Sequence, residues 1–274
     1  MTNSSEGPSL AADRASDFSN SINLGPPPAL RASSATALFL DFDGTLVDIA
    51  DHPDAVIVAP DLRPLLERLS DALDGRLAVI TGRSIAALEA LLGPAELAIA
   101  GSHGGEFRPA AKAAVEPLAS ALPDAVVARL HEVAHENGGL LVEPKPFSAA
   151  VHYRHHPEAR DNLLDCARQL AAEFGLGIKH GKQVIELTMP GSDKGTAVSR
   201  FMALPAFRGT TPVFLGDDVT DEDAFIAVDR LGGHGILVGA QRPTAAAFRF
   251  EGVAQVHHWL HAALRTFQKG DFQA

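Results

Sequence analysis

The chain has 274 residues, of which 46% are hydrophobic and 21% are charged, a balance typical of a globular protein with a substantial apolar core. Its formal net charge of −11 excludes the basic surface on which nucleic-acid binding depends, and no run approaches the ~20 apolar residues of a membrane span. A single cysteine, Cys166, excludes an internal disulfide and is typical of a reducing compartment. We therefore expect a cytoplasmic monomer that binds neither nucleic acid nor a membrane.

Residues 1–34 are rich in Ser, Ala, Pro and Asn, and they lack the apolar segment of a secretory signal. A segment of this composition buries too little apolar surface to offset the entropy that it loses on ordering. We therefore expect residues 1–34 to form a poorly ordered tail, and the folded part of the chain to begin at residue 35.

Beyond the tail, short apolar runs alternate with stretches in which apolar residues recur at helical spacing. The expected elements are strands at 38–43, 77–80 and 97–100 and helices at 61–73 and 84–92. Alternation of this kind predicts a Rossmann-like α/β fold, with a doubly wound parallel sheet and helices on both of its faces.

The pattern changes between residues 109 and 187, where a helix and a pair of strands occur twice in succession. The expected elements are helices at 123–136 and 157–174 and strands at 140–144, 149–153, 177–180 and 183–187. We expect residues 109–187 to form a smaller α+β cap domain, inserted into a core domain of residues 35–108 and 188–274. In the second part of the core the first pattern resumes, with helices at 194–202, 221–228 and 253–266 and strands at 212–215 and 235–238.

The stretch LFLDFDGTL, residues 38–46, leads an apolar strand directly into two carboxylates, Asp41 and Asp43. A glycine turn explains Asp43 beside Gly44, but it does not explain Asp41, which follows apolar residues. Two like charges at this separation repel each other unless a cation lies between them. The stretch therefore indicates a site that holds positive charge.

Other polar residues stand at comparable points of the predicted fold. Thr81 follows the second strand, Lys194 begins a helix, and a later strand ends in a run of carboxylates, namely Asp217, Asp218 and Asp221. Because ligands of such sheets bind beyond the carboxyl ends of the strands, we expect these side chains to share one site with Asp41 and Asp43.

The motifs DFDGTL, TGR, DKG and GDDVTDED resemble, in this order, the four motifs of the haloacid dehalogenase-like phosphohydrolases. AGSHGGEFR and GKQVIELTMPGSDKG further resemble the trehalose-6-phosphate phosphatase branch, which carries its cap between the second and third motifs. The resemblance covers nearly all of the chain from residue 36 onward. It implies a Mg²⁺-dependent phosphatase that acts on a small phosphorylated disaccharide, trehalose 6-phosphate. The alternative is a sugar phosphatase of the sucrose-phosphate or mannosyl-phosphate type.

The resemblance also implies how the core residues act. Asp41 is the nucleophile that forms an aspartyl-phosphate, and Asp43 is the general acid that protonates the leaving oxygen and then the base that activates water. Thr81 and Lys194 bind the phosphoryl oxygens. Mg²⁺ is held by Asp41, the backbone carbonyl of Asp43, and Asp217, as suits a hard cation. Two further carboxylates orient metal-bound water or the lysine: Asp218 and Asp221.

Recognition of the sugar is expected to come from the cap, because the core contacts only the phosphoryl group. Lys182 and Glu186 are the strongest candidates, since the family uses a Lys and a Glu at these cap positions. Exposed charge on a sheet face is the alternative interpretation and needs no function. The remaining substrate-binding candidates are Arg83, His103, Glu106 and Lys145.

A competing motif lies in the cap, where residues 131–135 read HEVAH and match the H-E-x-x-H pattern of zinc metallopeptidases. Catalytic zinc normally takes a third protein ligand, and the extended pattern requires a histidine where this chain has Leu141. The motif therefore leaves a zinc peptidase as a remote alternative to the polar face of a cap helix.

A phosphate-accepting module of the response-regulator kind is a third alternative, because such modules also combine clustered aspartates with a later lysine. They are single compact units without an inserted domain. The stretch from Asp41 to Thr45 and the predicted cap both argue against this class.

Overall fold

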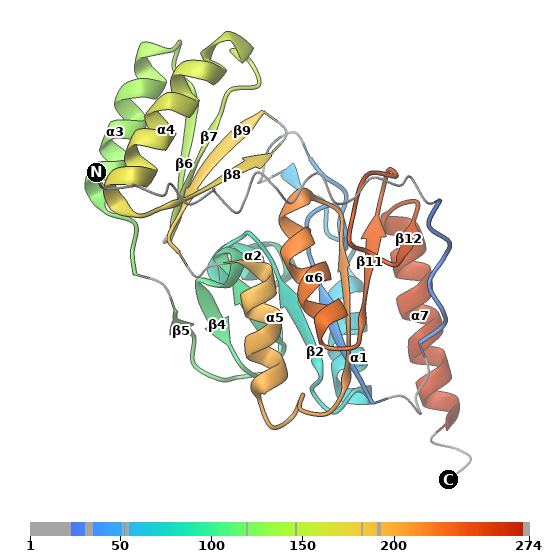
Figure 1. Ribbon diagram of the computed structural model, residues 1–274. Coiled ribbons are helices and arrows are strands. Elements are labelled where there is room, and N and C mark those ends of the chain that lie inside the picture. The colour runs from blue at the N-terminus through green and yellow to red at the C-terminus, as the bar shows by residue number, and fades with distance from the viewer. Residues whose placement is uncertain are drawn as a thin grey trace, which may run out of the picture.

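The computed structural model describes residues 23–30, 35–50, 52, 55–118, 120–145, 147–181, 183–190 and 193–270. These residues form one eight-stranded and one four-stranded sheet, each covered by helices of its own (Figure 1). We call the two parts the large unit and the small unit. The mixed α/β architecture with a mainly parallel large sheet confirms the predicted fold class.

The large sheet has the strand order β12-β11-β10-β1-β2-β3-β4-β5. The strands from β12 to β3 are parallel, whereas β4 pairs antiparallel with both of its neighbours. The strand bounds are Thr36–Leu40 for β1, Leu77–Ile80 for β2, Ala98–Gly101 for β3, Glu106–Arg108 for β4, Glu116–Pro117 for β5, Thr211–Gly216 for β10, His234–Val238 for β11 and Phe248–Phe250 for β12.

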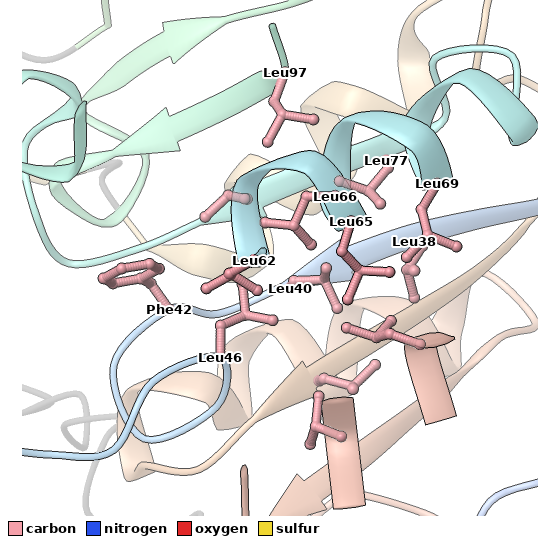
Figure 2. Packing of buried hydrophobic residues seen from close by; sticks show 14 of the residues in the cluster. Leu38, Leu40, Phe42, Leu46, Leu62, Leu65, Leu66, Leu69, Leu77 and Leu97 are labelled. Carbon is pink, nitrogen blue, oxygen red and sulfur yellow. The ribbon is translucent and has the colours of Figure 1, made fainter. Parts of the chain in front are cut away.

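Helices cover both faces of the large sheet. Successive side chains of β1 point to opposite faces, and because all of them are buried, each face packs against helices of its own. Leu38 and Leu40 join an apolar cluster with α1, α2 and α7, part of which Figure 2 shows. Ala37 and Phe39 join a second cluster with α5 and α6. The helix bounds are Leu62–Ala72 for α1, Ile85–Leu92 for α2, Lys194–Ala203 for α5, Glu222–Arg230 for α6 and Val253–Gly270 for α7.

The small unit has the antiparallel strand order β6-β7-β9-β8 and packs two helices, α3 and α4, against its sheet. Its apolar cluster is separate from those of the large unit and includes Cys166, which is buried as a small hydrophobic residue. The bounds are Leu141–Lys145 for β6, Ser148–His152 for β7, Gly177–Gly181 for β8, Val184–Thr188 for β9, Asp124–Glu136 for α3 and Arg160–Phe174 for α4.

Part of the predicted tail is packed against the large unit. Leu30 is buried in the same cluster as Leu38, and the Trp259 indole N–H donates to the carbonyl of Pro28 at 2.9 Å. The backbone N–H of Arg249 donates to the carbonyl of Gly25 at 2.9 Å. Residues 23–30 thus differ from the expectation of a poorly ordered segment, whereas the rest of the predicted tail lies outside the described residues.

Three short strands were not predicted: β4, β5 and β12. Since β5 lies within residues 109–187 but pairs with β4 of the large sheet, the four-stranded sheet begins later than the predicted cap boundary. The strand predicted at 38–43 ends at Leu40, so Asp41 and Asp43 lie in the loop that follows it.

Within the described ranges, no helix has both the length and the apolar character that crossing a bilayer requires.

Candidate active site

Three adjacent strands at the centre of the large sheet carry the predicted core residues. Leu40 at the end of β1 is level with Leu215 of β10 and Val79 of β2. Asp41, Asp217 and Thr81 therefore emerge side by side from the same edge of the sheet.

Lys194 begins α5 and lies between two buried carboxylates. Its Nζ donates to Oδ1 of Asp41 at 2.7 Å and to Oδ1 of Asp221 at 2.6 Å. Burial raises the pKa of Asp41 well above its usual range, although Lys194 opposes that shift. Burial by itself lowers the pKa of Lys194, but Asp221 and Asp41 together raise it above its usual range. The site is therefore a buried anionic pocket around one fixed cation.

Asp221 uses one carboxylate oxygen to hold Lys194 and the other to hold the surrounding loop. Its Oδ2 accepts hydrogen bonds from the backbone N–H groups of Asp217 and Asp218, each at 2.9 Å. Asp218 in turn accepts from the backbone N–H of Val219 at 2.7 Å. These contacts position Lys194 and the loop that carries Asp217.

Three carboxylates in this pocket are close enough to bind a metal ion. Oxygen atoms of Asp41, Asp217 and Asp221 lie within 4.8 Å of one another. Gly44 has a φ of +79°, and a Cβ there would lie 2.2 Å from Oδ2 of Asp217, so only glycine allows this close approach. An all-oxygen set of donors suits a hard divalent cation such as Mg²⁺.

Asp43 is held by Arg83 rather than by the buried lysine. The Nε of Arg83 donates to Oδ2 of Asp43 and its Nη2 donates to Oδ1, both at 2.7 Å. The backbone N–H of Arg83 donates to the Thr81 hydroxyl oxygen at 3.1 Å, and Thr81 is fully buried. The loop after β2 thus ties a predicted phosphoryl-binding residue to the predicted general acid.

Glu186 of β9 lies at the contact between the small and large units. Its Oε1 accepts from the Lys145 ammonium at 3.1 Å and from the Ser148 hydroxyl at 2.7 Å. Its Oε2 lies 3.4 Å from Nε2 of His103, a residue of the large unit. Burial by itself raises the pKa of Glu186, but Lys145 and His103 bring it well below the usual range. Burial lowers the pKa of His103 to about 4, although Glu186 opposes that shift.

One of the predicted substrate-binding residues, Glu106, stands apart from this cluster. Glu106 accepts from the backbone N–H of Ile85 at 2.7 Å and lies 3.3 Å from the Ser102 hydroxyl, so its carboxylate supports the start of α2. Lys182 lies outside the described residues. Ser148 was not predicted as a site residue, because a single serine in a short strand carries no pattern that marks it.

A cavity of about 640 Å³ opens beside Asp217. It is bordered by Gly44, Asp48 and Ile49 of the large unit and by His180 and Gly181 at the end of β8 in the small unit. The volume falls within the range typical of small-molecule sites. The carboxylate pocket is therefore open to a ligand from the side where both units meet.

The three polar residues of the HEVAH motif lie on the exposed side of α3. His131 and His135 are exposed, and Glu132 pairs with Arg129 at 2.8 Å. In the part of the chain that the structure describes, the candidate metal-binding groups of three or more side chains do not include them. The zinc alternative thus gains no support.

The architecture is that of the haloacid dehalogenase-like fold, and solved structures with this fold are similar to the chain. The C-terminal domain of Candida albicans trehalose-6-phosphate phosphatase gives a TM-score of 0.73 at 23% identity, covering 86% of this chain and 93% of that one. A haloacid dehalogenase-like hydrolase from Bacteroides thetaiotaomicron gives 0.58 at 18% identity, covering 86% and 99%. At such identities the likeness shows the fold.

Sequence comparison identifies the family. The trehalose-phosphatase family model matches residues 39–253. The chain is 38% identical to trehalose-6-phosphate phosphatase of Escherichia coli (strain K12), covering 86% of this chain and 90% of that protein. It is 39% identical to a probable trehalose-phosphate phosphatase of Sinorhizobium fredii, covering 77% and 80%. The chain belongs to the trehalose-phosphatase family of phosphoric monoester hydrolases, which confirms the family predicted from its motifs.

Proposed function

We propose that the protein hydrolyses trehalose 6-phosphate to trehalose and inorganic phosphate, with Mg²⁺ as its metal cofactor and an aspartyl-phosphate as its intermediate. The observation that carries this proposal is the buried arrangement of Asp41, Lys194 and Asp221, in a chain whose relatives are trehalose-phosphate phosphatases. The three side chains supply a nucleophile, a fixed cation and a group that holds the cation in place.

In the first step a carboxylate oxygen of Asp41 attacks phosphorus, and the bond from phosphorus to the sugar oxygen breaks. Asp43 gives its proton to that leaving oxygen. In the second step Asp43 takes a proton from water, whose oxygen attacks phosphorus and releases phosphate from Asp41. Lys194 and the hydroxyl group of Thr81 hold the phosphoryl oxygens during both steps.

Charge explains why the pocket needs cations. A carboxylate 4 Å from one phosphate charge is repelled by about 4 kcal/mol at an effective dielectric constant near 20. Asp41, Asp217 and the backbone carbonyl of Asp43 are the ligands that would hold Mg²⁺. When bound, the ion supplies the positive charge that offsets this repulsion together with Lys194.

The small unit is proposed to act as a cap that recognises the sugar. Among the described residues, the charged side chains of Glu186 and Lys145 are proposed to bind sugar hydroxyls. Lys182 is proposed from its family position. Closure of such a cap excludes water and commits the substrate to reaction. The cavity beside Asp217, bordered by both units, supports this arrangement.

The test is phosphate release from a panel of sugar phosphates, measured with Mg²⁺ and with EDTA. We expect trehalose 6-phosphate to give the highest kcat/KM and EDTA to abolish its hydrolysis. Preference for sucrose 6-phosphate or a mannosyl phosphate would assign the protein to the alternative sugar class. Activity that resists EDTA would contradict the proposed metal dependence.

A further inference from the structure

Arg83 binds the carboxylate of Asp43 through a pair of hydrogen bonds whose geometry requires an arginine. Nε and Nη2 donate two parallel hydrogen bonds, one to each carboxylate oxygen, both at 2.7 Å. Only the planar guanidinium group of arginine forms such a forked pair, because the ammonium of lysine is a single point of charge. The structure thus joins Arg83, predicted to bind substrate, to the predicted acid–base residue.

Arg83 is itself held in place by its surroundings. Its side chain is 14% exposed, whereas that of Asp43 is 35% exposed. The guanidinium carbon lies 6.0 Å from the centroid of the Phe42 ring, and the residue stands directly before Ser84, whose hydroxyl oxygen caps α2. The fixed partner of the pair is therefore Arg83, and the partner that needs orienting is Asp43.

We propose that Arg83 is a positioning residue that fixes the direction of the Asp43 carboxylate for both of its proton transfers. The inference rests on the proposed function, since it assigns Arg83 a part in that reaction. Asp43 gives a proton to the leaving sugar oxygen in the first step and takes one from water in the second. A carboxylate that is 35% exposed samples several rotamers unless a partner holds it, so loss of the fork slows both transfers.

The competing role for Arg83 is direct attraction of the substrate phosphate. The two roles differ in what lysine does at this position. A lysine keeps the positive charge but loses the fork, so Arg83→Lys preserves attraction and destroys orientation. We expect Arg83→Lys to lower kcat for the sugar phosphate roughly ten- to a hundredfold, with KM within about threefold of wild type. An unchanged kcat, or a rise in KM alone, overturns the inference.

The activated ester p-nitrophenyl phosphate separates the two chemical steps. Its leaving group needs no protonation, so only the second step depends on Asp43. Arg83→Lys is therefore expected to release the first equivalent of p-nitrophenol rapidly and later equivalents slowly. If Arg83 acted only by attracting the phosphoryl group, the lysine would keep that attraction, the second step would not slow and no burst would appear.

A double-mutant cycle with Asp43→Asn, followed on p-nitrophenyl phosphate, completes the test. A residue that acts through Asp43 has nothing left to orient once that carboxylate is gone, so Arg83→Lys is expected to change the residual rate of Asp43→Asn by less than about twofold. Losses that multiply in the double mutant overturn the inference. Arg83→Gln is made in parallel, and the melting temperature of each variant shows that it is folded.

The outcome also separates this inference from the proposed function. Wild-type protein that hydrolyses none of the sugar phosphates and no p-nitrophenyl phosphate overturns the proposed function, and the role of Arg83 falls with it. An active wild type whose rate survives Arg83→Lys overturns the role of Arg83 alone.

Discussion

At the scale of single residues, Asp41 is the side chain on which the proposed chemistry depends most. It is 4% exposed, and its Oδ1 accepts a hydrogen bond from Lys194. An amide has nearly the shape of a carboxylate but cannot act as the nucleophile. Because Lys194 keeps Asp221 as a partner, the loss of one charge from the crowded pocket leaves the fold intact.

We therefore expect Asp41→Asn to lower kcat by more than about a thousandfold while the melting temperature stays equal or rises slightly. Phosphate release and thermal melting measure the two effects. The control is Asp229→Asn, at an exposed position of α6, which should leave both quantities unchanged. Wild-type turnover in Asp41→Asn would remove the residue from the reaction.

His103 gives the protein a pH dependence with a definite sign. Burial lowers its pKa to about 4 from an ordinary value of 6.5, so the unfolded chain binds a proton that the folded chain excludes. As far as His103 determines it, the free energy of unfolding has its full value above pH 6.5 and decreases as the pH falls toward 4. Between pH 7 and pH 5 the loss amounts to about 2 kcal/mol.

We expect His103→Gln to remove this part of the acid sensitivity, because glutamine does not titrate. Urea unfolding of the variant and the wild type at pH 7 and pH 5 measures the difference, and His155→Gln, at an exposed position, is the control. Equal losses of stability in His103→Gln and wild type would show that His103 does not carry the effect. The window stops at pH 5, since Glu186 loses its own stabilising charge only at lower pH.

At the scale of elements, the apolar periodicity predicted all seven α-helices of the described residues. The reason is that each buries one face: α1, for example, buries Leu62, Leu65, Leu66 and Leu69. The strands β4, β5 and β12 were missed, because runs of two or three residues at a sheet edge show no period.

The strand ends also explain how much of the site could be predicted. Asp41, Thr81 and Asp217 follow apolar runs, and parallel strands bring such positions together. The partners of Asp43 and Glu186 could not be predicted in this way, because Arg83 and His103 reach them from distant loops. Those contacts depend on side-chain directions that only the packed structure determines.

The loop after β1 provides a prediction about backbone geometry. Gly44 and Gly75 both have a φ of +79°. A Cβ added at Gly44 would lie 2.2 Å from a carboxylate oxygen of Asp217, whereas a Cβ added at Gly75 would have nothing within 4 Å. Alanine at either position carries the same backbone cost of about 1 kcal/mol. Only Gly44→Ala also displaces the carboxylate of Asp217.

We therefore expect both variants to melt at lower temperature, and Gly44→Ala alone to need more Mg²⁺ for half-maximal phosphate release, by about tenfold or more. Titration of the activity with Mg²⁺ measures this. A Mg²⁺ requirement that changes equally in Gly44→Ala and Gly75→Ala would mean that the close approach of Asp217 to this loop is unimportant for the metal.

At the scale of the whole molecule, the small unit contacts the large one next to the loop that is proposed to bind the phosphoryl group. Glu186 reaches His103, whose backbone N–H donates to the carbonyl of Thr81 at 2.9 Å. The imidazole also packs on Gly82, where a Cβ would lie 2.7 Å from the ring. The sugar-recognising and phosphate-binding parts of the proposed site are thus in direct contact.

This contact gives Glu186 two candidate roles, which its substrates can separate. If Glu186 binds sugar hydroxyls, loss of a charge-assisted hydrogen bond costs about 1.5–3 kcal/mol. Glu186→Ala should then lower kcat/KM for trehalose 6-phosphate roughly ten- to a hundredfold. Hydrolysis of p-nitrophenyl phosphate, which has no sugar, should barely change, and Glu173→Ala on the exposed side of α4 should affect neither ester. Equal losses on both esters would mean that Glu186 supports Thr81 through His103, and that other residues select the sugar.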